Sequence, residues 1–205
     1  KDFQPMQKTA LHAKAARHDV RSMFRSWKEW KKQKNCLADY KSGRDKMSDI
    51  QFYSIERGTG EPLILLHGNG EESRYFARQI RHFAKTRKVI AIDTRGHGQS
   101  PRGNAPFTIR QFAEDLHDFM EEKGIERADI LGFSDGGNTA LAFALQYPQK
   151  VRRLILNGAN LYPSGMKPSI VLPIWAGYGA ASLLAPVSQK AKKQKELLGL
   201  MVKDP

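Results

Sequence analysis

One short string constrains the fold of this chain more than any other feature. It is a serine with glycine two positions before and two positions after it, Gly132-Phe133-Ser134-Asp135-Gly136. An apolar run at 128–131 precedes it and a helix-like segment at 137–145 follows it. On a sharp turn from a strand into a helix, a serine hydroxyl is exposed, and the crowded backbone leaves room only for glycine or another small residue beside it. The string therefore predicts a strand, a tight turn at Ser134 and a helix.

Two other segments each combine a buried strand with a glycine-rich exit. Residues 63–66 are all apolar and run into His67-Gly68-Asn69-Gly70, and residues 89–92 are followed by a second glycine-rich stretch at 93–100. Continuous apolar strands are typical of a parallel sheet that is buried on both faces. Helical patterns lie between these strands, so we expect right-handed crossovers and an α/β fold.

The order and separations of the three segments resemble the alpha/beta-hydrolase superfamily, over residues 50 to about 165. The resemblance implies a mostly parallel sheet with helices on both faces, and Ser134 as the catalytic nucleophile. It also implies an oxyanion hole formed by the backbone N–H groups of Asn69 and Asp135, with no metal and no organic cofactor. Ser134-Asp135-Gly136-Gly137, followed by Asn157-Gly158-Ala159-Asn160, resembles the valacyclovir-hydrolase (biphenyl-hydrolase-like) esterase group more closely.

The expected activity is that of a serine hydrolase. Ser134 would attack a small carboxylic ester, thioester or lactone and form an acyl-enzyme that water then hydrolyses. The Asp135 carboxylate is a candidate substrate-binding group, because it could pair with an ammonium group as in an amino-acid ester. It could also be an acid that the dipole of the following helix favours. The alternative function is that of a non-catalytic protein of the same fold that binds a small ligand.

The histidines do not complete this mechanism. The resemblance implies a catalytic acid after a later strand and a histidine near the C-terminus, but the last histidine is His117 and no Asp or Glu lies between Val151 and Lys195. A triad in the order Ser, Asp or Glu, His is therefore absent from the sequence. We expect an N-terminal part of a longer hydrolase that is nearly inactive by itself; a complete non-hydrolytic relative is the alternative. Four residues of the glycine turns are expected to shape or brace those turns rather than to catalyse: His67, Asp93, Arg95 and His97.

Other patterns predict the order of the elements. Alternation at 50–55 predicts a first strand, and Thr108 with Gln111 is a candidate capping box for a helix that ends at Gly124. After about residue 161 the alternation stops, and an apolar segment at 170–187 follows. Its length would allow a membrane span, but we expect Pro173, Gly177 and Gly179 to interrupt it, as in the start of a helical cap. The predicted division is an extension at 1–48, the hydrolase core at 49–165 and the cap at 166–205.

The net charge of +13 is concentrated at the N-terminus. Residues 1–48 contain 13 Lys and Arg against 5 Asp and Glu, with Val20, Met23, Phe24, Trp27 and Trp30 at helical spacing. This pattern predicts a basic amphipathic helix that either packs on the domain or contacts a membrane surface. No nucleic-acid-binding motif accompanies the charge. One cysteine permits no internal disulfide, so we expect a cytoplasmic protein, membrane-associated if the extension binds lipid. The strand at 151–157 would be an open sheet edge that favours self-association.

Overall fold

The computed structural model describes residues 48–159 and 168–203. These residues belong to a unit that runs from Ser48 to Pro205. The basic helix predicted for residues 1–48 lies outside the described residues, apart from Ser48.

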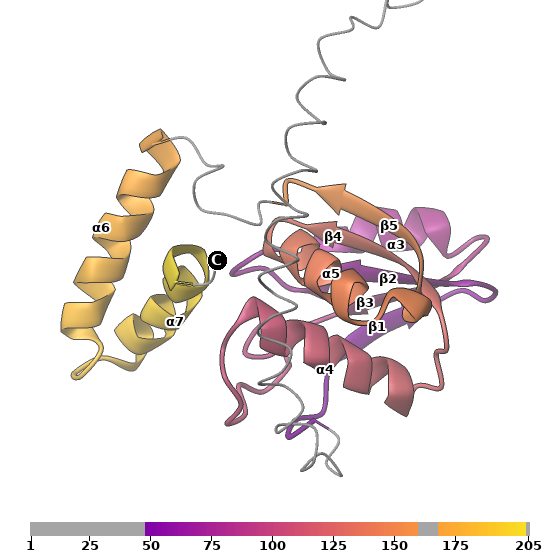
Figure 1. The fold of residues 1–205 in the computed structure, drawn as a ribbon, viewed down its shortest axis with the longest axis horizontal. Coiled ribbons are helices and arrows are strands. Elements are labelled where there is room, and N and C mark those ends of the chain that lie inside the picture. The colour runs from indigo at the N-terminus through magenta and orange to yellow at the C-terminus, as the bar shows by residue number, and fades with distance from the viewer. Residues whose placement is uncertain (1–47, 160–167, 204–205) are drawn as a thin grey trace, which may run out of the picture. The chain divides into compact units, whose positions relative to one another are not determined.

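A five-stranded sheet forms the centre of the fold (Figure 1). Its strands in chain order are β1 (Ser54–Arg57), β2 (Pro62–Leu66), β3 (Lys88–Ile92), β4 (Ala128–Phe133) and β5 (Val151–Asn157). Their order across the sheet is β1-β3-β2-β4-β5. β1 runs antiparallel to β3, whereas the other three pairs of neighbours are parallel. The predicted mostly parallel sheet is confirmed, and β5 lies at its edge.

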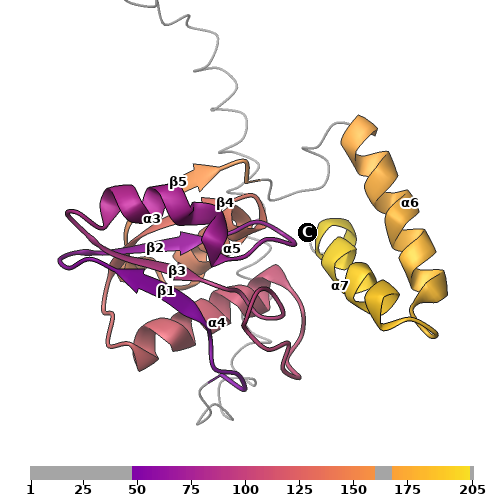
Figure 2. The ribbon, with the colours of Figure 1, turned by 180° about the vertical axis from the view of Figure 1, so that it is seen from behind.

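Helices cover both faces of the sheet. Figures 1 and 2 show α4 (Ile109–Glu122) and α5 (Asp135–Gln146) on one face and α3 (Ala77–Phe83) on the other. Short 3-10 turns, η1 (Ser73–Phe76) and η2 (Pro148–Lys150), precede α3 and β5. Successive strand residues point to opposite faces, so the central strands supply both halves of the core. Ile64, Leu66 and Ile90 pack among the residues of α4 and α5, whereas Leu63, Leu65 and Val89 pack with Phe76 and Ile80. This two-sided burial explains why the central strands are continuously apolar.

The ends of α4 follow the predicted signals with one difference. Thr108 is the N-cap, and its hydroxyl oxygen accepts a hydrogen bond from the Gln111 N–H at 3.1 Å. The Gln111 side chain does not return to Thr108 but donates to Asp115 Oδ1 at 2.9 Å, so only half of the capping box forms. Gly124, just after the helix, has a φ of 63°, a left-handed conformation that glycine adopts without strain.

Two sequence predictions were wrong in detail. The first strand begins at Ser54 rather than at residue 50, because the residues before it are bound to the loop after β3: the Tyr53 N–H donates to Ser100 Oγ at 2.9 Å. The expected interruption at Pro173 is also absent, since α6 (Pro168–Leu184) is continuous and contains this proline. A proline inside a helix removes one backbone hydrogen bond, which α6 tolerates near its start.

α6 is followed by α7 (Gln189–Lys203), and the two helices pack against each other. Among the residues that the structure describes, no helix combines the length and the apolar character needed to cross a membrane.

Candidate active site

Ser134 occupies a strained turn between β4 and α5. Its φ of 51° and ψ of −120° make it the only non-glycine residue with a positive φ in the described part of the chain. The turn is held by its own backbone: the Ser134 N–H donates to the Asn157 carbonyl at 2.8 Å, and the Ser134 carbonyl accepts from the Gly137 N–H at 2.8 Å. Backbone conformations of this kind cost about 1–3 kcal/mol and persist only where the surroundings enforce them. The predicted sharp turn is thus present at residue 134.

Glycines allow the backbone segments around Ser134 to approach closely. A Cβ atom on Gly132 would lie 2.6 Å from Gly137 Cα, and one on Gly136 would lie 2.5 Å from the His67 carbonyl oxygen. A Cβ atom on Gly68 would lie 3.2 Å from Ser134 Cβ. The loop after β2 therefore packs directly against the serine turn. A site shared by Ser134 and the 68–70 loop requires this close approach.

The two predicted oxyanion donors lie on these adjoining segments. Asn69 follows β2 in the 68–70 loop, and its Nδ2 donates to the Leu197 carbonyl of α7 at 2.6 Å. Asp135 is the first residue of α5, and its Oδ1 accepts from Asn138 Nδ2 at 3.3 Å. The N-terminus of a helix carries partial positive charge and favours an anion. The roles of Asn69 and Asp135 in binding an oxyanion or a substrate stay predictions.

Neither turn histidine is oriented as a base for Ser134. His67 Nδ1 donates to the Gly68 carbonyl at 2.8 Å, while its Nε2 accepts from the Thr94 N–H at 3.0 Å. His97 Nδ1 donates to the Arg95 carbonyl at 3.0 Å. Both rings are almost fully buried, at 2% and 4% exposure. In residues 48–159 and 168–203, no histidine forms a hydrogen bond with Ser134. These contacts agree with the expectation that His67 and His97 shape their turns.

The buried histidines should make stability depend on pH. Burial is the main cause that lowers the pKa of His97 from 6.5 to about 4, and the adjacent His67 and Lys193 lower it further against the opposing effects of the Arg95 carbonyl and Asp93. Burial also lowers the pKa of His67. Between pH 6.5 and 4 the unfolded chain binds protons that the folded protein does not, so the free energy of unfolding falls as the pH is lowered. His97 alone should account for a loss of roughly 3 kcal/mol.

Urea unfolding at pH 4, 5, 6 and 7 tests this dependence. A His97→Gln variant should show a flatter pH profile than the wild type, whereas His82→Gln, at an exposed position, should leave the profile unchanged. Equal slopes in the wild type and the His97→Gln variant would contradict the assignment of the effect to His97.

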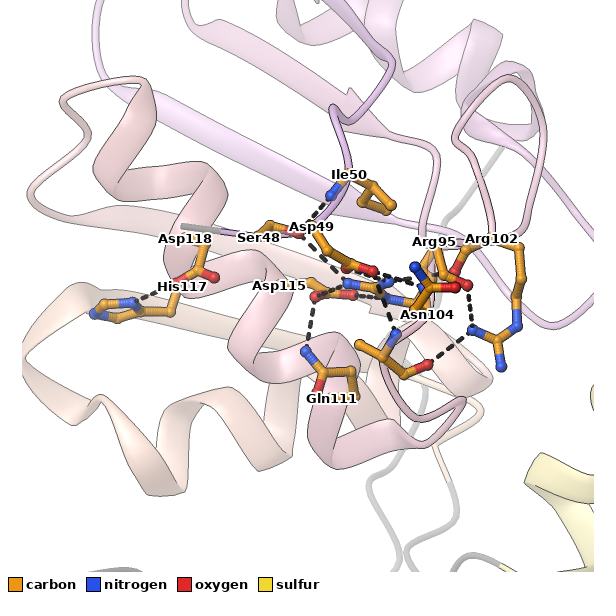
Figure 3. A network of polar contacts seen from close by, with 12 residues as sticks. Ser48, Asp49, Ile50, Arg95, Arg102, Asn104, Gln111, Asp115, His117 and Asp118 are labelled. Carbon is orange, nitrogen blue, oxygen red and sulfur yellow. Dashed lines mark hydrogen bonds and ion pairs between the residues drawn. The ribbon is translucent and has the colours of Figure 1, made fainter. Parts of the chain in front are cut away.

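A buried ion-pair network fixes the loop after β3 (Figure 3). The Arg95 guanidinium forms two parallel hydrogen bonds with Asp115 of α4, at 2.8 and 2.7 Å, and a third with Asp49 Oδ1 at 2.7 Å. The side chain of Arg95 is 0% exposed and that of Asp115 is 5% exposed, against 34% for Asp49. Arg95 therefore ties this loop to α4 and to the segment before β1, which is the bracing role expected for it.

Asp93 braces the same loop from its other side. Its Oδ1 accepts from the Ser73 N–H at 2.6 Å, and its Oδ2 accepts from the Gln99 N–H at 2.8 Å. A carboxylate so engaged with backbone donors serves the turn rather than a substrate. Across residues 48–159 and 168–203, no cluster of His, Cys, Asp and Glu has the arrangement of a metal site.

Sequence reasoning missed two residues that support the 68–70 loop. Glu71 Oε2 accepts from the Gly68 N–H at 3.0 Å, and Leu197 of α7 holds the Asn69 side chain through its carbonyl. An acidic residue three positions after a turn glycine is a local signal that could have identified Glu71. The contact with Leu197 joins residues 128 positions apart, and no local pattern in the sequence indicates it.

Comparison with known proteins places the chain in a family. The sequence model described as the alpha/beta hydrolase fold matches residues 61–186, which is more than half of the chain. The chain belongs to the alpha/beta-hydrolase family.

Individual relatives are similar over part of their length. An uncharacterized protein of Mycobacterium tuberculosis is 39% identical over 103 residues, which are 50% of this chain and 30% of that protein. A 2-hydroxymuconate semialdehyde hydrolase of Pseudomonas putida is 36% identical over 107 residues, which are 51% of this chain and 38% of the relative. The solved structure of Est816, described as an N-acyl homoserine lactone degrading enzyme, is 29% identical with a TM-score of 0.54, covering 74% of this chain and 61% of that one. The chain thus spans about a third of the length of these two curated relatives.

Proposed function

We propose that the full-length alpha/beta hydrolase that contains this chain hydrolyses a small carboxylic ester, thioester or lactone through an acyl-enzyme on Ser134. The observation that carries the proposal is the strained turn at Ser134. It holds a serine at a positive φ that glycine adopts without strain, and it packs this serine against the 68–70 loop. The names of relatives support the reaction class, since they include a semialdehyde hydrolase and a lactone-degrading enzyme.

In the proposed reaction, Ser134 Oγ forms a bond with the acyl carbon as a base removes its proton. The bond to the leaving alcohol or thiol then breaks, and the leaving group takes the proton. A water molecule attacks the acyl-enzyme, releases the acid and restores the serine. The N–H groups of Asn69 and Asp135 would stabilise the oxyanion of each tetrahedral intermediate. The base and its acid partner are assigned to a part of the protein outside these 205 residues, so the present chain alone should turn over substrate very slowly.

We propose that the acyl part of the substrate contacts the Asp135 carboxylate. A carboxylate next to the nucleophile would favour an acyl group with an ammonium substituent, as in an amino-acid ester. The position of Asp135 at the start of α5 also suits an acid that only stabilises the helix. A non-catalytic ligand-binding protein of the same fold stays the alternative function.

Replacing Ser134 with alanine in the full-length protein should remove esterase activity. Loss of a nucleophile lowers kcat by about 10⁶-fold in a well-studied serine hydrolase, because no other group can form the acyl-enzyme. A fluorophosphonate probe should label the wild-type protein at Ser134 and leave Ser134→Ala unlabelled. Ser73→Ala is the matched control and should keep both labelling and activity. Labelling that persists in Ser134→Ala would reject the serine mechanism.

The edge strand β5 suggests a partner for the described sheet. Ile155 and Leu156 are 46% and 42% exposed on this strand, and β4 is its one neighbour among the described residues. An unpaired strand edge readily accepts another strand. We propose that the remainder of the full-length protein, or a second copy of the chain, covers β5.

Contact of residues 1–48 with a membrane surface also stays a proposal, since these residues lie outside the described part apart from Ser48.

A further inference from the structure

A small cavity adjoins Asp135 and Gly136, the two residues that follow Ser134. Its walls come from the 68–70 loop, the loop after β3, the start of α5 and Leu200 of α7. The cavity has a volume of about 10 Å³, which is about the room that one water molecule needs. A cavity of this size with apolar walls would stay empty, whereas polar walls would favour a bound water molecule.

Setting aside Asp135, whose carboxylate has partners of its own, three buried polar atoms of the cavity residues have no hydrogen-bond partner in the described part of the chain. They are Asn69 Oδ1, His97 Nε2 and Thr139 Oγ1. His97 is 4% exposed and Thr139 is 1% exposed, so bulk water does not reach these groups. A buried polar group without a partner costs about 1–3 kcal/mol, and three such atoms around one cavity call for a common partner.

The hydrogen-bonding capacities of these atoms are defined by their other contacts. His97 Nδ1 faces the Arg95 carbonyl and must carry the proton, so Nε2 of the neutral ring is an acceptor. The Asn69 amide nitrogen donates to the Leu197 carbonyl, which leaves Oδ1 as an acceptor. The Thr139 hydroxyl can donate. The cavity therefore offers two acceptors and one donor.

We infer that this cavity binds one ordered water molecule. The water donates its two hydrogens to His97 Nε2 and Asn69 Oδ1 and accepts the Thr139 hydroxyl hydrogen, so the capacities of these three atoms are matched. Buried waters typically make about three hydrogen bonds of this kind. The Asp135 carboxylate also lines the cavity and accepts from Asn138 Nδ2 at 3.3 Å. No ring of charged ligands for a metal ion is present among the described residues.

The water connects three segments of the chain. The atoms that it joins form no hydrogen bonds with one another. Asn69 belongs to the 68–70 loop, His97 to the loop after β3, and Thr139 to the second turn of α5. The 68–70 loop and α5 adjoin the serine turn, and the loop after β3 lines the same cavity. The bound water is thus a positioning element for the 68–70 loop, and this inference does not depend on the proposed hydrolytic activity.

A crystal structure of the 205-residue protein tests the inference directly. We expect one solvent peak within about 2.7–3.2 Å of all three atoms. An empty cavity would overturn the proposal, and so would a peak at the shorter distances of about 2.4 Å that indicate a metal ion.

Substitutions at Thr139 test the same site in solution. The ring Hε1 proton of His97 should show a rotating-frame Overhauser cross-peak to a long-lived water. Thr139→Val, which keeps the shape but removes the hydroxyl, should weaken this cross-peak several-fold, whereas Thr139→Ser should retain it. Thr59→Val, at an exposed position, is the matched control and should leave it unchanged. A cross-peak of wild-type strength in Thr139→Val would overturn the proposal; if that variant does not fold, the cross-peaks of the wild type and Thr139→Ser decide.

Discussion

The Gly136→Ala variant is expected to lose about 3 kcal/mol or more of its free energy of unfolding. The added methyl group would lie 2.5 Å from the His67 carbonyl oxygen and closer still to that of Leu66. Both atoms belong to the backbone of β2 and its exit, so no change of side-chain rotamer can relieve the overlap. Either α5 must move away from β2 or the serine turn must open. Equilibrium urea unfolding, followed by far-UV circular dichroism, measures the loss.

Gly179→Ala is the matched control for this substitution. Gly179 lies in α6, and a Cβ atom there would meet nothing within 4 Å. Since alanine favours a helix over glycine by about 1 kcal/mol, this variant should be as stable as the wild type or slightly more stable. If Gly136→Ala unfolded at the same urea concentration as Gly179→Ala, the close approach of α5 to β2 would be wrong.

Substituting Asp115 with leucine should cost about 3–5 kcal/mol, the range for breaking one side of a buried ion pair. The loss follows because Arg95, with a side chain that is 0% exposed, would keep the partly exposed Asp49 as its one charged partner among the described residues. The double variant Arg95→Met/Asp115→Leu should recover most of the stability, since both buried charges are then replaced by apolar groups of similar volume. The Asp49 carboxylate loses its ion pair, but it is 34% exposed and still accepts from the Asn104 N–H.

A double-mutant cycle measured by urea unfolding separates these terms. Asp49→Asn serves as the comparison, because this carboxylate binds the same guanidinium but is 34% exposed, so its loss should cost clearly less than that of Asp115. Equal losses for Asp49→Asn and Asp115→Leu would show that burial does not determine the strength of this network.

Local patterns in the sequence predicted those parts of the fold that local geometry determines. The glycine spacing around Ser134 located the turn because only glycine permits the approaches seen at Gly132 and Gly136. Thr108 located the start of α4, because a side-chain oxygen before a helix accepts its first free N–H groups. The apolar strands located the sheet because each is buried on both faces.

Long-range contacts explain what the sequence could not predict. The alternation at 50–53 resembles a strand, yet the segment 49–53 is bound to the loop after β3. Asp49 accepts from Arg95, and the Tyr53 N–H donates to Ser100. The bracing role of Arg95 was expected, but its complete burial against Asp115 was not, since 20 positions separate the two residues. The site roles of Ser134, Asn69 and Asp135 stay predictions, because the groups that would complete the chemistry are not among the described residues.

The left-handed backbone of Ser134 has a consequence for how variants of this protein would be selected. Glycine would adopt the same φ and ψ without penalty, whereas serine keeps a conformation that costs about 1–3 kcal/mol. A library ranked only by thermal resistance would therefore enrich glycine at this position and discard the hydroxyl. Stability and the proposed nucleophilic role therefore oppose each other at Ser134, and an engineering campaign that aims to keep this role has to hold the residue constant while it improves the rest of the scaffold.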